Sequence, residues 1–132
     1  MATSYLFVSK LIASMLTDKV DVYRYINEVS EDGSTTTKLS SEPVVSNLPG
    51  RISFSYSKIE NAKIHDPSGD PIDHTPKIFF LTDADIKTGD IVTVKRYIPG
   101  TEEILVSYRG KIGLPNIFPT HIEVSISIEG TV

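Results

Sequence analysis

A strict alternation of apolar and polar residues stands near the C-terminus and constrains the fold most. The segment THIEVSISIEG (120–130) places Ile122, Val124, Ile126 and Ile128 at every second position. Successive side chains of a β-strand point to opposite faces, so this spacing predicts a strand with one face on an apolar core.

Five other segments have short strand-like patterns, and clusters of Gly, Pro and Asp separate them. Such a series indicates an all-β fold, either a small antiparallel barrel or a sandwich. Because 132 residues correspond to one domain, we predict a small antiparallel β-barrel over residues 18–132, with long loops and a short N-terminal helix. The segments are KVDVYRYI (19–26), GRISFSY (50–56), KIFFL (77–81), DIVTVKRY (90–97) and EEILVSY (102–108).

The first 17 residues have a different pattern. Val8, Leu11, Ile12 and Met15 fall at helical spacing, which predicts an amphipathic arm over residues 1–17 that docks on its own barrel or on a neighbouring subunit. The apolar stretch is too short to span a bilayer and lacks the features of a signal peptide, so we expect no membrane association.

Two connections are longer than barrel closure requires. Residues 27–43 are polar and rich in Ser and Thr, which predicts a wide hairpin with partly ordered arms. Residues 57–76 contain three prolines and one glycine without a clear element, and long loops of this kind are commonly functional or mobile.

The acidic stretch FFLTDADIKTGDIVTV (79–94) raises the question of a metal site. A calcium loop that starts at Asp83 would place Lys87 at a ligand position and Val94 where a glutamate is needed, so calcium is excluded. The interpretation that fits is a turn, with Gly89 at positive φ and Asp90 leading into the next strand.

Residues for catalysis are few. The chain has no cysteine, which excludes disulfides and thiolate chemistry and favours folding in a reducing interior. His65 and His74 stand near acidic residues in the long loop, and His121 can pair with Glu123 on one strand face. An S-x-x-K and a K-T-G sequence occur, but on a strand and in a turn instead of their enzymatic contexts. We therefore predict no enzyme, no cofactor and no metal site.

A basic and aromatic hairpin is the best candidate for binding. Pro99-Gly100 sets its turn, and if the arms pair we expect their basic and aromatic groups to share one end, where they could grip single-stranded nucleic acid or a partner. The alternative is an edge hairpin that uses charge against aggregation, and the net charge of −4 offers no basic excess. The candidate contact residues are Lys95, Arg96, Tyr97, Tyr108, Arg109 and Lys111.

Four motifs in order resemble a known family. MLTDKVDVYRY, GRISF, IFFLTDADIKTGDIVTV and PTHIEVSIS, from about Met15 to about Ile128, are similar to the head-closure (stopper) or minor capsid neck proteins of long-tailed bacteriophages. The resemblance implies a β-barrel that forms a homo-oligomeric ring below the portal-side connector, closes the DNA channel and offers a surface to the tail. Its implied partners are connector or adaptor and portal proteins, tail terminator or tail proteins, and packaged double-stranded DNA. Its implied location is the neck of the virion, after assembly in the host cytoplasm.

In such proteins an extended loop projects into the channel. Residues 57–76 are the first candidate here, and 27–43 the second. Carboxylates repeated around a ring would repel phosphate, so closure would be steric. Two other functions stay open: a small barrel that binds nucleic acid, and a connector on the tail-terminator side. The candidate channel residues are His65, Asp66, Asp70, Asp73 and His74.

Overall fold

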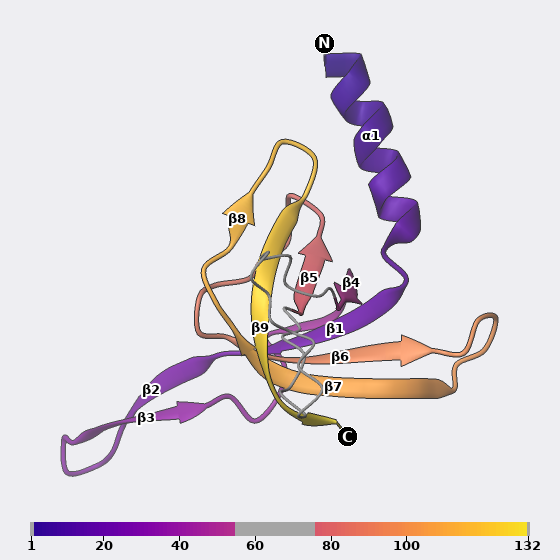
Figure 1. The fold of residues 1–132 in the computed structure, drawn as a ribbon. Coiled ribbons are helices and arrows are strands. Elements are labelled where there is room, and N and C mark those ends of the chain that lie inside the picture. The colour runs from indigo at the N-terminus through magenta and orange to yellow at the C-terminus, as the bar shows by residue number, and fades with distance from the viewer. Residues whose placement is uncertain (1, 55–75, 132) are drawn as a thin grey trace, which may run out of the picture.

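The computed structural model describes residues 2–54 and 76–131, and the regular structure there is almost entirely β-strand (Figure 1). One helix, α1 (Ala2–Met15), precedes the strands. The prediction of an all-β fold with a short N-terminal helix is confirmed. The strands are β1 (Asp18–Tyr23), β2 (Tyr25–Val29), β3 (Thr35–Leu39), β4 (Val45–Ser53), β5 (Lys77–Phe80), β6 (Ile91–Tyr97), β7 (Ile104–Ile112), β8 (Asn116–Ile117) and β9 (Ile122–Thr131).

Six of these strands close into an antiparallel barrel in the order β5-β4-β1-β6-β7-β9, and a pairing of β5 with β9 completes the circle. Strand β9 makes this possible by pairing through residues 126–131 with β7 and through residues 122–125 with β5. Closure gives each of these six strands a neighbour on both sides, so the fold is the predicted barrel and not a sandwich. The short strand β8 adds to β9 outside the circle.

The alternating residues fill the barrel as the sequence predicts. Ile122, Val124 and Ile126 of β9 are buried, and Ile128 packs against the same core. The apolar strand β5 adds Phe80, whose side chain is fully buried. The core cluster consists of Val20, Val22, Ile52, Ile78, Phe80, Val92, Val94, Ile112, Ile122, Val124 and Ile126.

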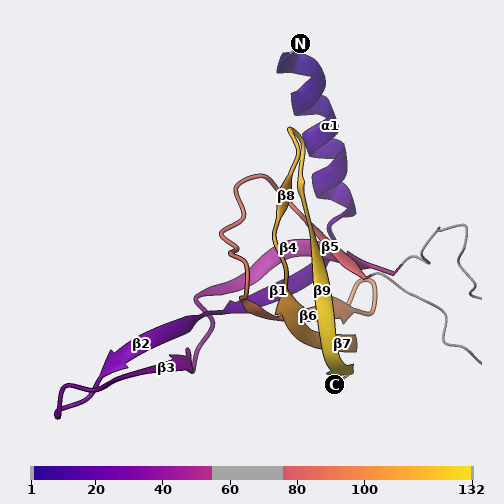
Figure 2. The same cartoon turned by 60° about the vertical axis from the view of Figure 1, so that its left-hand side comes forward.

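Two elements project from the barrel in both views (Figures 1 and 2). Helix α1 extends away from it, and Leu11 and Met15 are each 54% exposed, so these two side chains are not covered by the barrel. Docking on a neighbouring subunit, the other expectation for the helix, stays a prediction. Strands β2 and β3 form a separate two-stranded sheet over residues 25–39, which gives the hairpin predicted at 27–43 two ordered arms. The hairpin begins earlier than predicted, because the expected strand 19–26 is divided at Arg24 between β1 and β2. Of the 57–76 connection, only Pro76 lies within the described residues.

The acidic stretch 79–94 contains the turn that its sequence predicts. Gly89 has a φ of 90°, and the carboxylate of Asp90 accepts a hydrogen bond of 2.8 Å from the backbone N–H of Lys87. The turn therefore places one buried carboxylate at the start of β6.

Candidate functional site

Two arginine–aspartate pairs bracket the ladder between β1 and β6. The register aligns Lys19 with Lys95 and Tyr23 with Ile91, so the ion pairs Asp18–Arg96 and Arg24–Asp90 stand one residue beyond each end of the ladder. Each pair joins one carboxylate to a guanidinium through two hydrogen bonds, which is the strongest geometry for such a contact. An arginine–aspartate ion pair of the same geometry therefore stands at each end of the β1–β6 ladder.

The first pair is built into the barrel mouth. Asp18, whose side chain is fully buried, accepts hydrogen bonds from Arg96 Nε at 2.9 Å and Arg96 Nη2 at 3.0 Å, and from the Ile52 N–H at 2.9 Å. Arg96 Nη2 also donates to the Ile52 carbonyl at 2.7 Å. The hydrogen bond to Asp18 raises the pKa of Arg96, although burial opposes this. Arg96 is therefore a structural cation that anchors β6 to β1 and β4.

The second pair is similar. Asp90 accepts from Arg24 Nε at 3.0 Å and from Arg24 Nη2 at 2.9 Å. The hydrogen bond to Asp90 raises the pKa of Arg24, against the opposing effect of burial. Arg24 lies between β1 and β2, so this pair fixes the point at which the chain leaves the barrel for the hairpin.

Two further cations, Lys95 of β6 and Arg109 of β7, contact side chains of neighbouring strands. Lys95 Nζ lies 2.9 Å from Asp21 Oδ2, and the hydrogen bond to Asp21 raises the pKa of Lys95. The guanidinium of Arg109 lies 5.1 Å from the ring centroid of Tyr23, a cation–π distance, and Arg109 Nη1 donates to Thr93 Oγ1 at 3.0 Å. The position of Lys95 is therefore fixed by Asp21 of β1, and that of Arg109 by Tyr23 of β1 and Thr93 of β6.

The pairing of β6 with β7 separates the residues that the sequence grouped together. Lys95 and Arg96 stand opposite Ser107 and Val106, whereas Arg109 and Lys111 stand opposite Thr93 and Ile91. The expectation that they share one end of the ribbon is wrong, because the Pro99-Gly100 turn sets a register that staggers them along the strands. In the same hairpin, Tyr108 packs on Phe54, with ring centroids 5.2 Å apart, and contacts the core, while Tyr97 lines a hollow at the barrel mouth.

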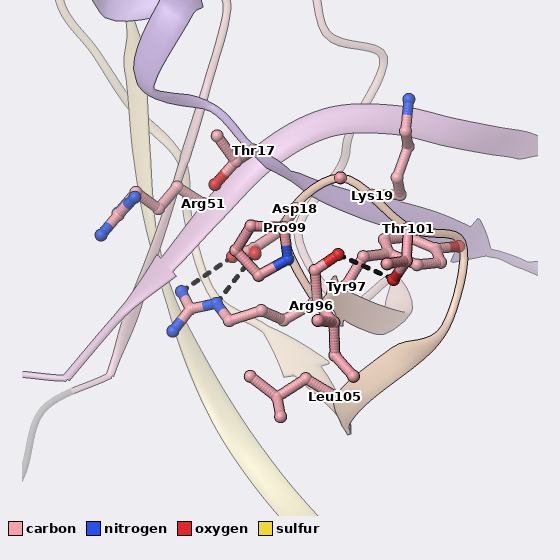
Figure 3. A pocket seen from close by; sticks show the side chains of 11 residues that line it. Thr17, Asp18, Lys19, Arg51, Arg96, Tyr97, Pro99, Thr101 and Leu105 are labelled. Carbon is pink, nitrogen blue, oxygen red and sulfur yellow. Dashed lines mark hydrogen bonds and ion pairs between the residues drawn. The ribbon is translucent and has the colours of Figure 1, made fainter.

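This hollow, of about 600 Å³, lies beside the Asp18–Arg96 pair (Figure 3). One wall is the β6–β7 turn, in which Thr101 N–H donates to the Ile98 carbonyl at 3.0 Å and Gly100 adopts a φ of 77°, as expected of a type II turn after Pro99. The full lining is Thr17, Asp18, Lys19, Arg51, Arg96, Tyr97, Ile98, Pro99, Gly100, Thr101 and Leu105, which we name the cationic hollow.

The cationic hollow combines charge with apolar surface. Lys19 and Arg51 line it together with the Asp18–Arg96 ion pair, and in Figure 3 the charged ends of Lys19 and Arg51 point away from Asp18. Ile98, Pro99 and Leu105 supply the apolar part of the wall. Such a surface can bind an acidic group that carries an adjoining apolar side chain. Lys19 and Arg51 were not predicted as part of this site, since they come from β1 and β4 and no local pattern links them to the β6–β7 hairpin.

A second groove, of about 420 Å³, lies at the base of α1. It is lined by Ile12, Met15, Leu16, Arg51, Ser53, Phe79, His121 and Glu123. The predicted pair of His121 with Glu123 is confirmed, with Nε2 and Oε2 2.8 Å apart, and the imidazole stacks on Phe118 at a centroid distance of 5.0 Å.

The remaining predicted residues, His65, Asp66, Asp70, Asp73 and His74, lie outside the described residues. Within residues 2–54 and 76–131, no three His, Asp or Glu side chains are grouped as a metal site would need. In the same part of the chain, α1 is not long and apolar enough to cross a membrane.

The fold and the site together define a closed six-stranded antiparallel barrel with two projecting elements and a cationic hollow at one mouth. Comparisons with protein-family models, with curated proteins and with solved structures found no match.

Proposed function

We propose that this protein is a structural head–tail connector component of a long-tailed bacteriophage, a head-closure protein without catalytic activity. In this role it forms a ring below the portal-side connector, helps to close the DNA channel and offers an attachment surface to the tail. The proposal rests on the resemblance over residues 15–128 and on the shape of the molecule.

The observation that carries the proposal is the pair of projecting elements. An isolated two-stranded hairpin is at best marginally stable in water, yet β2–β3 stands away from the barrel and exposes Tyr25, Ile26 and Val29. Helix α1 exposes Leu11 and Met15 in the same way. Exposed apolar groups on two separate projections are typical of a subunit whose neighbours cover them in an assembly.

The first alternative, a nucleic-acid-binding barrel, has less support. A binding module needs cations that can reach phosphates. Lys95 and Arg96 are paired with carboxylates, and Arg109 lies over Tyr23. We expect no binding of a single-stranded oligonucleotide at physiological salt, and tight binding that Lys95→Ala and Arg109→Ala abolish would favour the alternative instead.

Removal of the gene from the phage tests the proposal directly. DNA-filled heads that lack the protein should lose their genome and fail to join tails, and wild-type protein supplied in trans should restore both. Matched variants without residues 2–15, or with residues 26–38 replaced by a short turn, should restore neither if the projections make the assembly contacts. Heads that keep their DNA and join tails without the protein would contradict the proposal.

A connector on the tail side would use similar projections, so position in the particle decides between the two roles. An image of the neck that places the barrel directly below the connector supports head closure. A barrel ring at the tail terminator supports the alternative.

A further inference from the structure

We infer that the tip of the β2–β3 hairpin of one copy docks into the cationic hollow of a second copy, so that the subunits join head to tail. The hairpin tip comprises residues 28–32. This inference rests on the proposed ring and specifies the contact that would build it. Four features of the described residues support it.

The first feature is position. Strand β1 begins at the cationic hollow, with Asp18 and Lys19 in its lining, and after Arg24 the chain continues into the hairpin. The projecting hairpin and the hollow therefore lie at opposite ends of β1, and Figure 1 shows β2–β3 on the side away from the β6–β7 turn. Two different surfaces at opposite ends make a heterologous contact, which closes into a ring or extends into a filament.

The second feature is charge. The hairpin carries three carboxylates, Glu28, Glu31 and Asp32, against one ammonium group, Lys38. In the hollow, Asp18 neutralises Arg96, so Lys19 and Arg51 give an excess of two positive charges. Opposite potentials on two surfaces steer encounter and fix the register of docking.

The third feature is which charges remain for a partner. Asp32 accepts hydrogen bonds from Ser30 Oγ, from Ser34 Oγ and from the Ser34 N–H, so it holds the shape of the turn. Glu31 and the cations Lys19 and Arg51 form no ion pair within residues 2–54 and 76–131. Arg51 Nη1 donates a hydrogen bond of 3.5 Å to the Met15 carbonyl within one copy, so docking would add an ion-pair partner for Arg51, as it would for Lys19 and Glu31.

The fourth feature is apolar surface on both sides. Val29 at the tip is 71% exposed, and Leu105 in the wall of the hollow is 60% exposed. Ile98 beside Leu105 is also exposed. Contact between these groups would remove apolar area from water, and area removal is the main driving force of association. The charged residues around them would select the partner.

Charge reversal on each surface tests the inference, because the two reversals should compensate. The hairpin variant Glu28→Lys/Glu31→Lys and the hollow variant Lys19→Glu/Arg51→Glu should each weaken self-association about tenfold or more. In an equimolar mixture, a basic tip meets an acidic hollow and an acidic tip meets a cationic hollow. The mixture should therefore associate like the wild type, as should the quadruple variant by itself. Sedimentation velocity over a concentration series at low salt measures all of these.

Two control variants separate this contact from general effects. Lys38→Ala breaks the ion pair of Lys38 with Glu28 but keeps the acidic tip, so it should associate at least as well as the wild type. Lys87→Glu/Lys111→Glu changes the net charge as much as the hollow variant does, but near Arg24 at the other end of β1, so it should have no effect. Far-UV circular dichroism confirms that each variant is folded.

The outcomes also separate this inference from the proposed function. If the wild type associates but the reversals change nothing, or if mixing restores nothing, the inference is overturned and a ring built by other contacts stands. If the wild type stays monomeric at the highest concentration tested, the inference is again overturned. The loss of DNA from heads without the protein tests the proposed function in either case.

Discussion

The barrel and the β2–β3 hairpin are both antiparallel and both follow strand patterns, but different interactions hold them. In the barrel, every strand has two neighbours and its inward side chains are buried in a shared core. In the hairpin, each strand has one neighbour, and every side chain of β2 is exposed. Both regions thus have paired strands. The difference is that only the barrel strands have one face buried in a shared core.

The ion pairs of the two regions differ in the same way. The Asp18–Arg96 pair has two hydrogen bonds and a carboxylate without solvent exposure. The Glu28–Lys38 pair of the hairpin has one contact of 3.4 Å between side chains that are about half exposed. Burial and geometry decide what such a pair contributes, so the first should stabilise the fold and the second should contribute little.

The largest contrast should come from removing apolar volume. Phe80→Ala leaves a cavity in the core and should lower the free energy of unfolding by about 3–5 kcal/mol. Val29→Ala in the hairpin should change it by less than about 0.5 kcal/mol. Urea unfolding followed by circular dichroism measures both, and similar losses for the two variants would mean that the hairpin belongs to the same cooperative unit.

Removal of one carboxylate from each ion pair should give the next contrast. Asp18→Asn leaves the guanidinium of Arg96 at the barrel mouth without its charge partner and should cost about 3 kcal/mol. Glu28→Gln should cost less than about 1 kcal/mol. The same unfolding curves provide the values, and an Asp18→Asn protein as stable as the wild type would show that solvent compensates Arg96.

Glycine substitutions should separate steric crowding from backbone strain. A Cβ added at Gly110 of β7 would stand 2.3 Å from the Ser127 carbonyl oxygen in β9, so Gly110→Ala should cost about 2 kcal/mol. Gly33 in the hairpin turn has open space around it but a φ of 87°, so Gly33→Ala should disturb only the turn. Global unfolding should detect the first change, whereas NMR chemical shifts of β2 and β3 should detect the second.

The smallest effect should be a pH dependence confined to the hairpin. Hydrogen bonds from Ser30 and Ser34 lower the pKa of Asp32 well below its ordinary value of 3.8. A carboxyl with a lowered pKa stabilises the folded form above its unfolded pKa, and this contribution is lost as the pH falls from about 4 towards the folded value. Backbone chemical shifts of residues 30–34 should therefore move towards unfolded values below pH 4. The Asp32→Ala variant should show such values already at pH 7, and unchanged shifts there would contradict the role of Asp32.

Local features of the fold could be predicted from the sequence because local rules govern them. Alternation identified the buried face of β9, and the Pro99-Gly100 dipeptide identified a turn in which Gly100 takes a positive φ that glycine accepts readily. The spacing of His121 and Glu123 on one strand face predicted their contact. Strand β8, with only two residues, has too few positions to show a period and was not predicted.

The candidate site was less predictable. Arg96 stands next to Lys95 and Tyr97, and this neighbourhood suggested a nucleic-acid contact. Its partner Asp18 is 78 positions away, and no periodicity links the two residues. Lys19 and Arg51 reach the cationic hollow only because β1, β4 and the β6–β7 turn meet at one mouth of the barrel.

The sequence by itself determined the approximate positions of the barrel strands β1, β4, β5, β6, β7 and β9, the apolar face of β9 and the turns at Gly89 and Pro99-Gly100, because these properties depend on neighbours a few residues apart. The tertiary structure decided which strands pair, that β5 and β9 close the circle, and which charges are neutralised inside the barrel. The physical reason is that an alternating pattern requires a partner for its apolar face without specifying one. Register and closure follow only when all strands share one core.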